Sequence, residues 1–82
     1  MVRIIADFQP FARDQKITVY SDGNIIEEVK VTIDGITNSL KGLRNKYEAA
    51  EIDLIGNSGY LSKFQKELNS DFSSTKVNII QR

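Results

Sequence analysis

The chain has 82 residues, with 11 basic and 11 acidic side chains and no net charge, and it contains neither cysteine nor histidine. This length allows one domain, and 40 % hydrophobic with 27 % charged residues is the composition of a globular protein. The missing residue types exclude disulfides, thiolate nucleophiles, histidine-dependent triads and zinc sites with cysteine or histidine ligands. Proteins that neutralise phosphates usually carry a basic excess, so the charge balance does not favour nucleic acid as the partner.

The first part of the chain predicts three strands, at residues 2–8, 16–20 and 25–33, because these runs are rich in β-branched residues. Pro10 lies in the connection between the first two strands and removes a backbone donor there. Asp22 and Gly23 separate two β-rich runs, which is a strong hairpin signal. The alternation of apolar and polar residues breaks at Ile25 and Ile26, which predicts a bulge in the third strand.

The second part of the chain predicts two amphipathic helices. A strand at residues 51–55 follows the first helix, and a strand at residues 76–80 follows the second. The apolar stripes are Ile36, Leu40, Leu43 and Tyr47 in the first helix, and Leu61, Phe64 and Leu68 in the second. Asp34 and Ser58 are the expected N-caps of the two helices. The element order is therefore β-β-β-α-β-α-β, an α/β domain over residues 1–82 with one five-stranded mixed sheet and two helices.

This element order resembles the ribonuclease H-like fold, which the actin-like half-domain shares. Asp7, near the end of the first strand, stands where nucleases of that fold place their first metal-binding carboxylate. The run Asn57-Ser58-Gly59-Tyr60-Leu61, after the fourth strand, looks like the Asp-Ser-x-Tyr run of the same nucleases. The resemblance implies a site near Asp7 and Asn57.

The sequence departs from that pattern at the residues that would carry the chemistry. Asn57 replaces the second metal-binding Asp, and the Glu expected in the first helix has no counterpart. Two-metal phosphoryl chemistry needs several converging carboxylates, so we expect no nuclease activity and no cofactor, with Asp7 as the one weak candidate for a metal ligand. The Gly-rich phosphate turn of actin-like ATPases is also missing, since Gln9, Pro10 and Phe11 stand there.

Two further groups of residues are candidate binding sites. Asn57, Ser58 and Gly59 lead from a strand into a helix, and the backbone donors of a helix N-terminus favour an anion; a tight turn with a Ser cap is the simpler interpretation. Phe11 follows Pro10 in a connection and is expected to be exposed.

Basic residues on the two helices form the other candidate surface. Lys63 and Lys66 on the second helix are candidate partner contacts, and with Lys41 and Arg44 on the first they would form a cationic face if the helices lay side by side. A solvated helix face with local charge pairs is the commoner outcome of such a pattern.

These features predict a non-catalytic binding module that acts on a protein partner or by self-association, by strand addition or helix-face docking, such as a phage or mobile-element accessory protein. The alternatives are a degenerate ribonuclease H-like domain that binds nucleic acid, and a binder of small anions or nucleotides at the turn of Gly56, Asn57, Ser58 and Gly59. No segment approaches the ~20 apolar residues of a membrane span, and the initial apolar run ends at Asp7, too early for a signal peptide. We therefore expect a cytoplasmic location and no membrane partner.

Overall fold

The computed structural model describes residues 1–71 and 74–82. In chain order its elements are β1 (Val2–Asp7), β2 (Asp14–Ser21), β3 (Asn24–Thr32), the 3₁₀ turn η1 (Ile33–Gly35), α1 (Ile36–Tyr47), β4 (Glu51–Gly56), α2 (Ser58–Asp71) and β5 (Lys76–Gln81). The predicted order β-β-β-α-β-α-β is confirmed.

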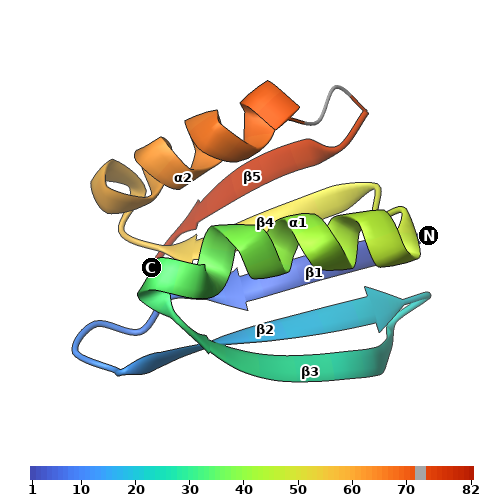
Figure 1. The fold of residues 1–82 in the computed structure, drawn as a ribbon, viewed down its shortest axis with the longest axis horizontal. Coiled ribbons are helices and arrows are strands. Elements are labelled where there is room, and N and C mark those ends of the chain that lie inside the picture. The colour runs from blue at the N-terminus through green and yellow to red at the C-terminus, as the bar shows by residue number, and fades with distance from the viewer. Residues whose placement is uncertain (72–73) are drawn as a thin grey trace.

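The five strands form one mixed sheet with the order β3-β2-β1-β4-β5. β1 is antiparallel to β2 and parallel to β4, and β4 is parallel to β5. The predicted mixed sheet is therefore confirmed, with β3 and β5 as its edges. Because β1, β4 and β5 point the same way, their carboxyl ends lie together at one end of the sheet (Figure 1).

The hairpin and the bulge lie where the sequence predicts them. Asp22 and Gly23 have φ values of 51° and 86°, and positive φ at both central residues is what a tight two-residue hairpin turn requires. In the β2–β3 pairing Val19 lies opposite Glu27 and Tyr20 opposite Ile25, so Ile26 is the extra residue of a bulge.

Both predicted helix caps are wrong. Asp34 lies inside η1, and α1 has Gly35 at its N-cap without a side-chain hydrogen bond. The intervening 3₁₀ turn moves the start of α1 to Ile36, which carries Asp34 out of the capping position. In α2 Ser58 is already helical, and Asn57 Oδ1 accepts a hydrogen bond from Tyr60 N–H at 3.0 Å. Asn57 is therefore the N-cap.

Both helices lie over the same face of the sheet (Figure 1), and the core fills the space between the helices and the sheet. The predicted stripes of both helices are buried, apart from the partly buried Tyr47, and meet the inward side chains of β1, β2, β4 and β5, which are Ile4, Ala6, Ile17, Val19, Ile52, Leu54 and Val77. This arrangement leaves the ends of the sheet as the places where loops can form a site. Among the described residues, no helix is long and apolar enough to cross a membrane.

Candidate functional site

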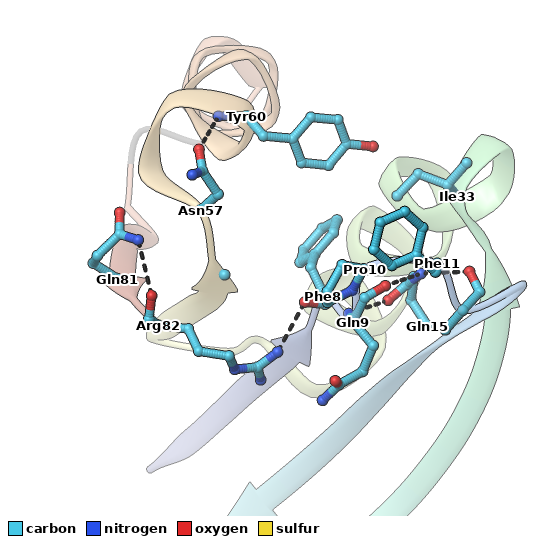
Figure 2. A pocket seen from close by; sticks show the side chains of 12 residues that line it. Phe8, Gln9, Pro10, Phe11, Gln15, Ile33, Asn57, Tyr60, Gln81 and Arg82 are labelled. Atoms are coloured by element: carbon cyan, nitrogen blue, oxygen red, sulfur yellow. Dashed lines mark hydrogen bonds between the residues drawn. The ribbon is translucent and has the colours of Figure 1, made fainter.

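A pocket of about 490 Å³ lies at the carboxyl ends of β1, β4 and β5 (Figure 2). Open α/β sheets bind ligands at the carboxyl ends of their parallel strands, where neighbouring connections leave in different directions. Its apolar lining is Phe8, Pro10, Phe11, Ala12, Ile33 and Tyr60, and its other lining residues are Gln9, Gln15, Gly56, Asn57, Gln81 and Arg82. The structure thus brings together two sequence candidates, Phe11 and Asn57, that are 46 positions apart (57 minus 11).

Phe11 stands on the rim of this pocket with its side chain fully exposed, as expected. Its φ is 63°, in the left-handed region that a bulky L-residue rarely adopts and that costs about 1–2 kcal/mol. An exposed ring adds no packing energy inside the chain to offset this cost. The position therefore combines two unfavourable features, which marks it as a candidate functional residue.

The loop that carries Phe11 is hydrogen-bonded to the buried side chain of Gln15. This side chain is 4 % exposed, and its Oε1 accepts a hydrogen bond from Gln9 N–H at 2.6 Å. Its Nε2 donates to the carbonyl oxygens of Gln9 at 3.3 Å and Ala12 at 3.2 Å. One buried amide thereby satisfies three backbone groups on both sides of Phe11 and fixes the direction of the loop.

The wall opposite the loop is aromatic. The Tyr60 ring, on the first turn of α2, packs edge-on against Phe64 at a centroid distance of 5.5 Å and against Phe8 at 6.4 Å. Tyr60 is 45 % exposed, whereas Phe8 and Phe64 are buried. Two of the three rings thus belong to the core, and Tyr60 presents the exposed part of the cluster to the pocket.

Gly56 permits the close approach of β4 to this cluster. Its φ is 155°, and a Cβ at this position would lie 3.2 Å from Phe8 Cβ and 3.3 Å from Leu61 Cδ1. Any side chain here would displace the buried Phe8 or the first turn of α2. Gly56 is therefore required by the packing of the site.

The N-terminus of α2 uses most of its donors inside the chain. Ser58 N–H donates to Gln81 Oε1 at 2.8 Å, and Tyr60 N–H donates to Asn57 Oδ1. An anion at Asn57, Ser58 and Gly59 would have to displace the Gln81 amide, which already supplies the acceptor that this helix end requires.

Asp7, the candidate metal ligand, is engaged by side chains of this chain. Its carboxylate accepts a hydrogen bond from Gln9 Nε2 at 3.2 Å and forms an ion pair with the Arg82 guanidinium. Arg82 also donates to the carbonyl oxygen of Phe8 at 3.0 Å. Among residues 1–71 and 74–82 no group of three or more acidic side chains is placed so that it could hold a metal ion, so the donor set does not fit the two-metal centre that the fold's nucleases imply.

The predicted cationic helix face is divided between different environments. Lys63 lies over the rings of Tyr60 at 4.9 Å and Phe64 at 5.1 Å, beside the pocket wall but outside the pocket lining. Lys66 is exposed and does not line the pocket either.

Lys41 and Arg44, two of the three basic residues of α1, connect that helix to the α2–β5 region. Lys41 forms an ion pair with Asp71, whose hydrogen bond raises the pKa of the lysine. Arg44 donates to Thr75 Oγ1 at 2.7 Å and to Ser74 Oγ at 2.8 Å. Both cations are therefore engaged by partners within the chain.

Three residues of the site were not predicted from the sequence. Tyr60 lies beside the apolar stripe of α2, and an aromatic residue off the stripe at the first helical turn is a signal that could have identified it. Gln15 contacts backbone groups three and six positions away in its own loop, and Arg82 contacts a carbonyl oxygen 74 positions away. Neither residue type at its position signals such a contact.

Comparison with solved structures supports the fold. The chain superimposes over 99 % of its length on the nuclease domain of the large terminase subunit of bacterial virus Sf6, with a TM-score of 0.70 and 10 % identity. Over the same 99 % of its length it also superimposes on Archaeoglobus fulgidus Pelota (TM-score 0.65, 7 % identity) and on the Aquifex aeolicus Ppx/GppA phosphatase (TM-score 0.60, 14 % identity). The fold is ribonuclease H-like, as the element order indicated.

The likeness to these proteins extends to the fold alone. The chain spans 26 % of the Pelota chain and 36 % of each of the other two. No protein-family model and no curated protein matches the sequence.

Proposed function

We propose that this chain is a non-catalytic binding module that recognises a protein partner through the loop of Phe11 and the adjoining pocket. The observation that carries the proposal is the fully exposed Phe11 ring in a left-handed conformation, on a loop fixed by the buried Gln15. Exposed aromatic residues beside well-formed pockets are typical anchors of protein interfaces. A rigid loop lowers the entropy lost when such an anchor binds.

The chemistry of the surface supports a protein partner rather than a substrate. The polar lining consists of amide side chains and Arg82, and Arg82 is paired with Asp7. Amides bind the mixed donors and acceptors of a peptide backbone, and the titratable groups of this lining are the Tyr60 phenol and the Arg82 guanidinium. We propose that the chain is a small cytoplasmic accessory protein of a phage or mobile element.

Photo-crosslinking tests this proposal. Benzoylphenylalanine is placed at position 11, at position 66 on the alternative helix surface, and at position 24 in the distant hairpin as the background control. We expect a specific crosslinked protein from position 11 and none from position 24. Capture from position 66 in place of position 11 would assign the interface to the helix face, and absence of capture from position 11 contradicts the proposal.

A second candidate is binding of single-stranded nucleic acid at the same pocket. The exposed rings of Phe11 and Tyr60 and the guanidinium of Arg82 line it together, and rings with a nearby cation can stack bases. Affinity for a labelled oligonucleotide would then fall steeply as salt rises. A steep salt dependence that is lost in Phe11→Ala supports this candidate, and no measurable binding at low salt removes it.

A further inference from the structure

We infer that the protein bound at this pocket is a second copy of the chain, with the Phe11 ring of each copy seated in the pocket of the other. This inference rests on the proposed function and names its partner. One surface carries both a projecting aromatic ring and an apolar recess beside it. A surface that holds a feature and its complement side by side can pair with itself about a two-fold axis.

The pocket has the size and lining that an aromatic side chain requires. Its volume is about 490 Å³, within the roughly 300–1,000 Å³ of sites that enclose small ligands. Tyr60 and Ile33 form its opposite walls (Figure 2), and Tyr60 presents an exposed ring for an edge-to-face contact of the kind it already makes with Phe8.

The charges around the pocket allow two copies to approach. Asp7 and Arg82 neutralise each other within one copy, and the chain as a whole has no net charge. The remaining polar rim is formed by the amides of Gln9, Asn57 and Gln81, which both donate and accept hydrogen bonds. Like-charge repulsion therefore does not oppose an isologous contact here.

The contact is small, and this sets the strength of the dimer. We expect a contact of two rings and two short loops to bury less than the roughly 1,200–2,000 Å² of a standard stable interface. We expect a reversible dimer that forms as the protein concentration rises and separates on dilution.

Sedimentation equilibrium of the purified chain over a wide concentration range tests the inference. The wild type and Arg13→Ala, a control at an exposed position of the same loop, should rise toward twice the monomer mass. Phe11→Ala should remain a monomer at every concentration, and its fold is verified by its NMR spectrum. A wild type that stays monomeric throughout, or a Phe11→Ala variant that dimerises as well as the wild type, overturns the inference.

A mixing experiment separates reciprocal insertion from any other loss of association. Phe11→Ala lacks the ring but keeps the Tyr60 wall of the pocket, and Tyr60→Ala keeps the ring but lacks that wall. One ring–pocket contact is restored when the two variants are mixed, so the mixture should sediment as heavier species than either variant alone at the same total concentration. A mixture no heavier than its components overturns reciprocal insertion.

The crosslinking experiment distinguishes failure of this inference from failure of the proposed function. A product of two chains from position 11 supports the second copy. Capture of a different protein from position 11, with a monomeric purified chain, overturns the second copy and leaves the proposed function standing. Absence of any product overturns both.

Discussion

Gln15 holds Gln9 by both of its backbone groups, accepting a hydrogen bond from the N–H at 2.6 Å and donating one to the carbonyl oxygen at 3.3 Å. The two residues are the ends of the segment that contains Phe11, so this pairing closes the loop as a backbone ladder closes a hairpin. The third bond, to the carbonyl oxygen of Ala12, stabilises the residue directly after Phe11. The exposed ring is therefore carried by a loop whose backbone is hydrogen-bonded to the side chain of Gln15.

Replacing Gln15 should loosen this loop and destabilise the fold. Gln15→Met keeps the length of the buried side chain and removes three hydrogen bonds, so we expect a loss of about 1–3 kcal/mol in the free energy of unfolding. Urea denaturation measures it. Gln65→Met is the matched control, because Gln65 makes one such bond, to the carbonyl oxygen of Val77. A loss at Gln15 no larger than that at Gln65 would show that the loop does not depend on this amide.

Removing the side chain of Phe11 should leave the fold intact or stabilise it. Glycine adopts positive φ without steric cost, so Phe11→Gly should change the free energy of unfolding by between zero and about 1 kcal/mol in favour of the folded state. Thermal denaturation of the dilute protein measures the change. A loss of stability comparable to that of a core truncation would mean that the ring packs within its own chain.

Two glycines should respond to alanine in opposite directions. Gly56→Ala places a methyl group 3.2 Å from Phe8 Cβ at a φ of 155°, and we expect a loss of about 1–3 kcal/mol. Gly42→Ala lies in the middle of α1, where a Cβ meets nothing within 4 Å, and should gain about 1 kcal/mol through helix propensity. Chemical denaturation of both variants checks this pair. Equal effects would contradict the close packing assigned to Gly56.

The dependence of stability on pH should change in Tyr47→Phe. Hydrogen bonds from the Tyr47 hydroxyl and from Lys46 lower the pKa of the Glu27 carboxyl below 4.5. A carboxyl whose pKa is lower in the folded state stabilises the fold above the unfolded pKa, and this contribution is lost as the pH falls through the folded pKa. Tyr47→Phe removes the main cause.

Urea midpoints measured from neutral pH downward test this dependence. The wild type should lose more stability below pH 4.5 than Tyr47→Phe does. Tyr20→Phe, which removes the phenol hydroxyl of a tyrosine in β2, should follow the wild type. Identical pH profiles for the wild type and Tyr47→Phe would disprove the role of this hydrogen bond.

Most of this fold is predictable from the sequence because the residues of each strand, turn and helix have the propensities and periodicity of that element. The Asp22-Gly23 turn, the bulge at Ile26 and both helix stripes depend on propensities and periodicity of neighbouring residues. The helix caps were misassigned because the exact first helical residue depends on one turn of backbone geometry, as the 3₁₀ turn before α1 shows.

The site was only partly predictable for a different reason. Phe11 and Asn57 were identified separately, from a proline-containing loop and from a strand-to-helix turn, and sheet order alone brings them together. The Asp7–Arg82 ion pair joins residues 75 positions apart. The hydrogen bonds of Gln15 to its loop depend on the side chain pointing inward, toward that loop. Neither has a local signature.

The proposed binding surface depends most on Phe11 being held outward in one fixed conformation, and backbone ¹⁵N relaxation of the dilute protein measures this directly. We predict order parameters of about 0.85 for the backbone of Gln9, Phe11 and Ala12, equal to those of a rigid strand, with coupling constants and NOEs that give Phe11 a positive φ. Order parameters below about 0.6 in this loop, or a negative φ at Phe11, would contradict it.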